Sequence, residues 1–322
     1  MLSHPFQLLH HDRPYVSLLA SFLVWKSLVL IIVLLSPGRG YDTSTTAVPS
    51  FLNGPAPSGL VQKALRHLTV RFVRWDAIYF TQIAEHGYVY EQEWAFGWGH
   101  TGTLRLLATF IGPALGYDRL NTDAIAFAGV LLAHCCHVAS VVVLYWLTKE
   151  VFQHEEEGKK QRLGLAVALL HILSPAGVFL SAPYAEAQFA LINFLGMYVF
   201  VKAVGAYRRG REVVGTSLIV LVGVLFGLAT LFRGNGLFSG LTIVAYALET
   251  CLSLLKGKGN LVTLSFRLAV LGATGVLMAG LASWPQILAY KEYCLHTEAE
   301  DMRPWCTSFI PSIYAWVQKD NW

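Results

Sequence analysis

Charged residues are scarce in this chain, and it lacks the clusters that usually hold metals. Only 14% of its 322 residues are charged, whereas 55% are hydrophobic. Five cysteines do not make a disulfide scaffold, and no CxxC pair or His/Cys cluster at metal-ligand spacing occurs. A soluble domain of this size would not be so apolar, and the sequence indicates neither a metal nor another cofactor.

The positive charge is small and spread over several places. The formal net charge of +4 comes mostly from short Lys/Arg clusters between apolar runs. Membrane proteins carry such clusters in their cytosolic loops, so the charge does not require nucleic acid as a partner. We therefore expect membrane lipids, and not nucleic acid, as partners.

Long apolar runs predict an all-α polytopic membrane protein, because a helix needs about 20 apolar residues to cross a bilayer. A run at 104–115 is too short to cross and is expected to be re-entrant or interfacial. In the first long run, Lys26 would snorkel or face a neighbouring helix; a secretory signal peptide is the rival interpretation of that run. About seven spans are predicted, at 17–35, 123–147, 163–180, 187–204, 213–232, 237–255 and 261–283.

The connections between spans alternate in charge. One set is basic, and the other, SAPYAE and RGNG, is short and carries a single basic residue, Arg233. The basic set belongs in the cytosol. Counting spans from these connections then places the N-terminus in the cytosol and the loop at 36–103 on the other, non-cytosolic side. Tyr184, Glu186, Asn235 and the tail 284–322 share that non-cytosolic side. Polar residues on one face of an apolar bundle favour chemistry at the membrane surface.

Residues 71–98, RFVRWDAIYFTQIAEHGYVYEQEWAFGW, combine charges and aromatic rings. Charges near lipid are costly unless they are solvated or paired, so such crowding indicates function. Asp76 stands where a short amphipathic helix would begin, and Gly87 would end it. Asp76 is either the N-cap of that helix or a chemical group, and both interpretations stay open.

Transfer of a sugar from a lipid phosphate needs a base, cations for the phosphate and apolar room for the lipid. Asp76 would serve as the catalytic base, with Arg74 and Arg233 near the phosphate. Capping, turn formation, ion pairing and membrane anchoring are the structural alternatives for these candidates. The full set of candidate substrate-binding residues is Arg74, Trp75, Tyr79, Glu91, Trp94, Tyr184, Glu186, Arg233 and Asn235.

The cysteines and the intramembrane histidines divide by environment. Cys294 and Cys306 lie in one polar stretch and would pair if it faces an oxidising lumen. The other cysteines, Cys135, Cys136 and Cys251, lie in apolar runs and are expected to be inert small hydrophobic residues. The histidines within spans are expected to be hydrogen-bonded core residues rather than ligands: His134, His137 and His171.

An ordered set of motifs runs through the chain from Phe72 onward: RWDAIYF, IAEHGYVYEQEWAF, SPAGVFLSAPYAEAQF, LFRGNG, WPQ, RPWC and PSIYAWVQ. In this combination the sequence resembles the PIG-V family, the second mannosyltransferase of glycosylphosphatidylinositol (GPI) anchor synthesis. The segment GWGHTGTLRLL after WAF departs from the family pattern, which has a proline-containing segment there.

The resemblance implies a GT-C type glycosyltransferase of the endoplasmic reticulum membrane with a large first lumenal loop. It implies an inverting transfer of the second mannose, through an α-1,6 linkage, from dolichyl-phosphate mannose to the GPI precursor. Asp76 matches the acid expected in the first lumenal loop. The chain is expected to form a single transmembrane domain, 1–322. Family members extend past the tail 284–322, so this tail is expected to be incomplete.

Two alternatives from other classes remain at this point. A lipid or solute transporter would need polar groups within the spans and broken helices, of which the sequence offers few. The second alternative is a non-catalytic membrane partner of a glycosyltransferase. Whether the protein requires a small partner subunit stays open.

Overall fold

The computed structural model describes residues 13–36, 44–48, 57–117, 120–295 and 302–320. This part of the chain is helical and contains no strand. Parts of the expected first loop (37–43 and 49–56) and of the expected tail (296–301 and 321–322) lie outside the described residues.

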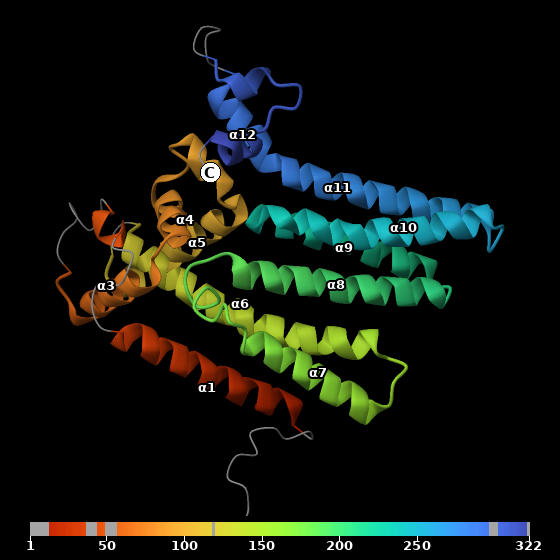
Figure 1. Ribbon diagram of the computed structural model, residues 1–322, viewed down its shortest axis with the longest axis horizontal. Coiled ribbons are helices and arrows are strands. Elements are labelled where there is room, and N and C mark those ends of the chain that lie inside the picture. Colours follow the sequence, from red (N-terminus) through yellow and green to blue (C-terminus); the bar gives the residue numbers. More distant parts are fainter. Residues whose placement is uncertain (1–12, 37–43, 49–56, 118–119, 296–301, 321–322) are drawn as a thin grey trace, which may run out of the picture.

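Six helical segments of the described chain are long and apolar enough to cross a membrane. Figure 1 shows α6, α8, α9, α10 and α11 running along the length of the molecule, with α1 at one side. This confirms the expected all-α polytopic membrane architecture. The six are Pro14–Leu35 (α1), Thr122–Val151 (α6), Glu186–Arg208 (α8), Glu212–Phe232 (α9), Gly234–Leu255 (η4, Gly234–Ser239, followed by α10, Gly240–Leu255) and Leu261–Tyr293 (α11).

Shorter helices gather at one end of this bundle: α3 (Leu60–Phe72), α4 (Asp76–His86) and α5 (Trp98–Ile111) (Figure 1). The apolar residues of α4 recur every three or four positions, so Ala77, Phe80 and Ala84 share the buried face. Gly87 ends the helix at φ 86°, a conformation that favours glycine. The short amphipathic helix predicted from Asp76 to Gly87 is therefore confirmed.

Helices α6 and α8 lie parallel to each other. Near their starts, Gly129 of α6 approaches Pro183 so closely that a Cβ would lie 2.4 Å from the proline ring. At their ends, Lys202 of α8 pairs with Glu150 of α6 at 3.2 Å. Two parallel helices joined in sequence require the connecting chain to return along the bundle.

The returning segment differs from the span predicted at 163–180. Helix α7 (Glu157–Ile172) has 16 residues and is too short to cross alone, at about 1.5 Å per residue. Residues 173–185 complete the return in turns. Irregular backbone at membrane depth is tolerated where protein buries it, and Leu180, Ser181 and Tyr184 are all buried here. The prediction of one continuous helix at 163–180 was therefore wrong.

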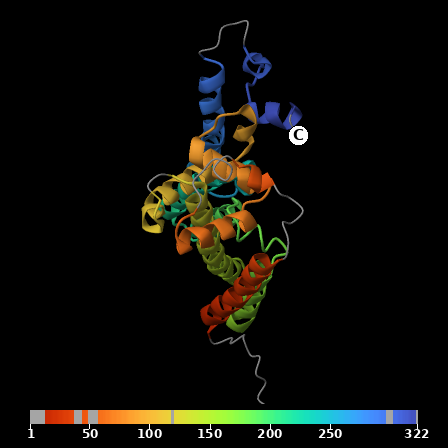
Figure 2. The same cartoon turned by 90° about the vertical axis from the view of Figure 1, so that its left-hand side faces the viewer.

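The described part of the tail is folded. Helix α11 continues ten residues beyond the span predicted at 261–283 and ends at Tyr293. A disulfide then joins Cys294 to Cys306. After the turn η5 (Pro304–Thr307), helix α12 (Ile313–Asp320) packs on η2 (Glu91–Ala95), and Figure 2 shows this contact from the side.

The basic connections lie at the end of the bundle opposite α3, α4 and α5. Some basic side chains at this end pair with nearby acids, as Lys149 does with Glu157 and Arg267 of α11 does with Glu212. The basic connections therefore lie at one end of the bundle, and SAPYAE and RGNG lie at the other, as the positive-inside bias predicts.

Single cysteines test the arrangement. Cysteines at Glu155, Arg209 and Lys258 should react with a membrane-impermeant maleimide from one side, and those at Val89 and Phe309 from the other, because an odd number of crossings separates the two groups. Labelling in sealed and permeabilised microsomes measures this. Labelling of positions 155 and 209 from opposite sides would show that 157–185 does not return the chain.

Candidate active site

Asp76 begins helix α4 directly after a strained backbone turn. Trp75 has φ 48°, and it is the one non-glycine residue with positive φ in the described chain. Such a conformation costs of order 1–3 kcal/mol and persists where surrounding structure imposes it. Trp75, not Asp76, occupies the N-cap position, and no side chain caps the helix. The capping interpretation of Asp76 is therefore wrong.

Contacts from distant segments hold this turn. The Tyr184 hydroxyl donates to the Arg74 carbonyl at 2.8 Å, across 110 residues of sequence. Val73, just before it, is fully buried, and its amide bonds to Thr69 at 2.8 Å. Trp75 is 57% exposed and its ring lies 6.4 Å from that of Phe179. Tyr184 thus acts as a structural tether of the RWD turn.

Glu186 and Arg233 form an ion pair beside this turn. Glu186 is the first residue of α8, and Arg233 joins α9 to η4, so the pair connects two chain segments. The second carboxylate oxygen of Glu186, Oε2, is buried and has no hydrogen-bond partner among the described residues. It is an acceptor that a hydroxyl group can satisfy.

The Asp76 carboxylate is influenced by both protein and Arg233. Surrounding protein displaces part of its hydration, which raises its pKa above the ordinary value of 3.8, and the Arg233 charge opposes this rise. No hydrogen bond or ion pair within the described chain occupies the carboxylate. Asp76 is therefore an available acid with increased proton affinity, and the structure brings it together with Arg74, Tyr184, Glu186 and Arg233.

Two glycines allow Arg233 to lie where it does. Gly97 and Gly99, at the start of α5, face the end of α9, and a Cβ at Gly97 would overlap the Phe232 carbonyl. A Cβ at Gly99 would meet Leu231 at 3.0 Å. The segment GWGHTGTLRLL thus supplies the close contact that positions Phe232, the residue before Arg233.

An aromatic row leads away from Asp76. Tyr79 stacks on Phe96 at 4.5 Å, and the Phe96 carbonyl accepts from the Tyr88 hydroxyl at 2.9 Å. Tyr88 in turn stacks on Trp94 at 4.4 Å. Tyr79 lies on the same helix as Asp76, whereas Trp94 packs in the cluster formed by the disulfide and α12.

Glu91 belongs to a second group of contacts. Its carboxylate pairs with Arg303 at 3.3 Å and accepts from the Trp305 indole at 3.2 Å. These bonds tie η2 to η5, so neither Glu91 nor Trp94 directly contacts Asp76, Arg74, Glu186 or Arg233 in the described chain. Asn235 is exposed on η4 and makes no hydrogen bond in the described chain.

His100 is a residue that the sequence did not single out. It is fully buried, and its Nε2 lies 3.2 Å from the Pro183 carbonyl. Burial lowers its pKa to about 4, so the ring is neutral at physiological pH. It supports the residue before Tyr184 from helix α5. No local signal marks this role, because the contact joins residues 83 apart.

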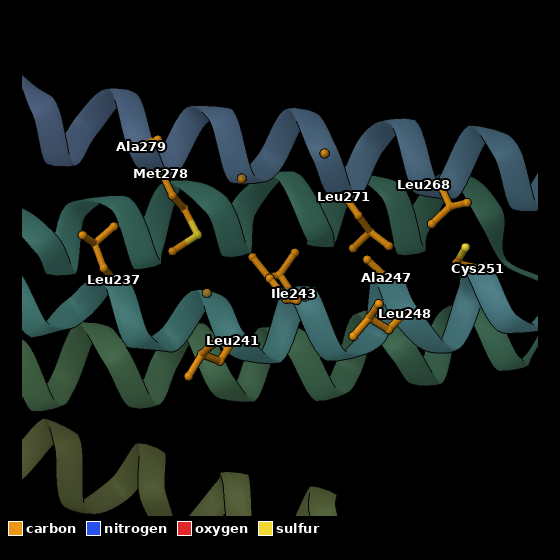
Figure 3. A pocket seen from close by; sticks show the side chains of 14 residues that line it. Leu237, Leu241, Ile243, Ala247, Leu248, Cys251, Leu268, Leu271, Met278 and Ala279 are labelled. Carbon is orange, nitrogen blue, oxygen red and sulfur yellow. The ribbon is translucent and has the colours of Figure 1, made fainter. Parts of the chain in front are cut away.

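An apolar cavity of about 530 Å³ lies between α10 and α11. Side chains such as Leu241, Ile243, Leu271 and Met278 line it (Figure 3). It reaches Leu237, four positions after Arg233. Among the described residues, no group of three His, Cys, Asp or Glu could hold a metal.

Comparison with known proteins agrees with this architecture. A family model described as Mannosyltransferase (PIG-V) matches residues 15–322. Proteins named GPI mannosyltransferase 2 are 36% identical in Aspergillus oryzae (98% of this chain, 68% of that protein), 37% in Chaetomium globosum (97% and 69%) and 36% in Aspergillus fumigatus (98% and 63%). No solved structure matches the chain. The chain thus spans about two thirds of the length of these relatives.

The helices define an all-α polytopic membrane protein, and the match to the PIG-V family model places it in the GT-C glycosyltransferase class. Within that class, the chain belongs to the Mannosyltransferase (PIG-V) family.

Replacement of Gly97 by alanine should displace Phe232 and, with it, Arg233. We expect a loss of transfer activity of roughly 10- to 100-fold, since about 1 Å of misplacement has that scale of effect. Mannose transfer in microsomes containing equal amounts of protein measures it. Gly102→Ala is the matched control on the same helix, because nothing lies within 4 Å of its added Cβ. Equal activity of the two variants would contradict the assignment.

Proposed function

We propose that this protein transfers the second mannose, in α-1,6 linkage, from dolichyl-phosphate mannose to the GPI-anchor precursor at the lumenal face of the endoplasmic reticulum membrane. The observation that carries the proposal is the Asp76 carboxylate, which has a raised pKa, no bonded partner in the described chain and Arg233 nearby. The relatives named GPI mannosyltransferase 2 support the substrate class.

Asp76 acts as the base of a single displacement. It removes the proton of the acceptor hydroxyl while that oxygen forms a bond to the anomeric carbon of mannose. The bond from that carbon to the phosphate oxygen breaks, and dolichyl phosphate leaves with the electron pair. One base is sufficient, because a single displacement converts a β-linked donor into an α-linked product.

The guanidinium groups neutralise the departing phosphate. Arg233 is placed by the α5–α9 contact and partly neutralised by Glu186, while Arg74 lies in the turn before Asp76. Guanidinium groups match phosphate oxygens in geometry and stay charged at any relevant pH. The free Oε2 of Glu186 accepts a bond from a sugar hydroxyl.

Aromatic side chains and the apolar cavity supply the remaining surfaces. Trp75 directly precedes Asp76, and Tyr79 lies three residues further along α4; their rings form the surfaces for the sugar. The lipid chain of the donor lies along the apolar cavity between α10 and α11, which reaches Leu237, four positions after Arg233 in sequence. Glu91, Trp94 and Asn235 act at the margin of the sugar pocket, where the η2 and η4 segments present them.

Asp76→Asn should reduce mannose transfer by at least about 100-fold, because an amide cannot take the acceptor proton. The measurement is complementation of cells that lack the second GPI mannose, followed by identification of the lipid that accumulates. Glu249→Gln, an exposed acid on α10, is the control for loss of a carboxylate elsewhere. Retained transfer by a correctly inserted Asp76→Asn protein would end the proposal.

The pH dependence of kcat/KM provides a second test. The base works when deprotonated, so activity should fall as pH decreases through the raised pKa of Asp76. Arg233→Gln removes the charge that lowers this pKa, and the acid limb of its residual activity should therefore move to higher pH. A limb that stays in place or moves to lower pH would show that Asp76 is not the titrating group.

A further inference from the structure

An ammonium group lies inside the apolar bundle, on α1. Lys26 is 5% exposed, and its Nζ donates to the Leu180 carbonyl and to the Ser181 hydroxyl, both at 2.8 Å. The Phe22 ring is 5.6 Å from the same nitrogen. These bonds show that Lys26 faces a neighbouring segment and does not snorkel to the interface. It forms no ion pair in the described chain.

The Leu180 carbonyl needs a donor because the helical ladder is broken there. In a continuous helix the Tyr184 amide would bond to it, but that amide bonds to the Ala182 carbonyl at 2.7 Å. Pro183, between them, has no N–H. A buried carbonyl with no donor is destabilising, and Lys26 provides the missing bond.

The segment that Lys26 holds leads into the candidate site within a few residues. Pro183 is bonded to His100, Tyr184 to the Arg74 carbonyl and Glu186 to Arg233. Ser181 also donates to the Gly177 carbonyl at 2.7 Å, so the same hydroxyl joins the two halves of the turn. Lys26 is therefore the support of this segment from the side opposite to the site.

We propose that Lys26 is a positioning residue for the transfer reaction: by bonding residues 180 and 181 across the bundle, α1 fixes the location of Tyr184 and Glu186 relative to Asp76. This rests on the proposed function. Lys26 does not touch the reacting groups, so its removal shifts Tyr184 and Glu186 relative to Asp76 and leaves the Trp75 and Tyr79 rings and the apolar cavity in place.

In Lys26→Met the new side chain is similar in length to lysine but has no hydrogen-bond donor. It should lower kcat by about 10-fold or more, with KM for dolichyl-phosphate mannose and for the mannosylated glucosaminyl-inositol lipid changed less than about 2-fold. Ser181→Ala removes one of the two acceptors and should lower kcat by about 2- to 5-fold, and the double variant should be no worse than Lys26→Met. Lys26→Arg keeps the donors and should restore part of the loss.

Lys202→Met is the matched control, because it removes a lysine whose partner, Glu150, lies at the other end of the bundle. Unchanged kcat in Lys26→Met, or an equal loss in the control, would overturn the proposal. If Lys26→Met does not accumulate in membranes, Ser181→Ala decides: unchanged kcat in that variant also overturns it.

A second readout does not depend on activity. Ala182 is 1% exposed, so a cysteine placed there should react slowly with a maleimide in a chain whose Cys135, Cys136 and Cys251 are replaced by alanine. Adding Lys26→Met should accelerate labelling by about 10-fold, since the turn is released. Unchanged labelling refutes the role of Lys26. If the unmodified chain transfers no mannose but Lys26→Met still accelerates labelling, the proposed function is refuted and the structural role of Lys26 is not.

Discussion

Backbone hydrogen bonding inside the membrane is the constraint on which the arrangement of this protein depends. Residues 173–185 leave the helical ladder, and Leu180, Ser181 and Tyr184 among them are buried in protein away from water, so other elements must provide donors and acceptors. Lys26 from α1, His100 from α5 and the Arg74 carbonyl do so. Because each of these bonds joins distant parts of the chain, the irregular segment unites α1, α5, α8 and the RWD turn into one unit.

The candidate site is a consequence of that unit. Asp76, Glu186 and Arg233 come from three segments, and none of them is positioned by its own helix alone. The strained Trp75 shows that the surrounding contacts impose the backbone that presents Asp76. The pKa of the Asp76 carboxyl is set by two opposing effects: loss of hydration raises it, and the Arg233 charge lowers it.

Much of the outline was predictable from local patterns. Apolar runs identified the membrane spans, and the spacing of Ala77, Phe80 and Ala84 identified α4 and its end at Gly87. The break after Ile172 was missed, because an apolar run has the same composition whether or not its backbone is helical. The partners of Glu91 were missed as well, since Arg303 and Trp305 lie more than 200 residues away.

The sequence by itself determined the class of the molecule and the side of the bundle on which its chemistry-bearing residues lie, because hydrophobicity and the Lys/Arg bias act through composition and order along the chain. Only the tertiary structure decided which of those residues meet. The pairing of Glu186 with Arg233, the tether from Tyr184 to Arg74 and the bond from Lys26 to Leu180 depend on distances in space between segments that are far apart in sequence. No local pattern encodes such distances.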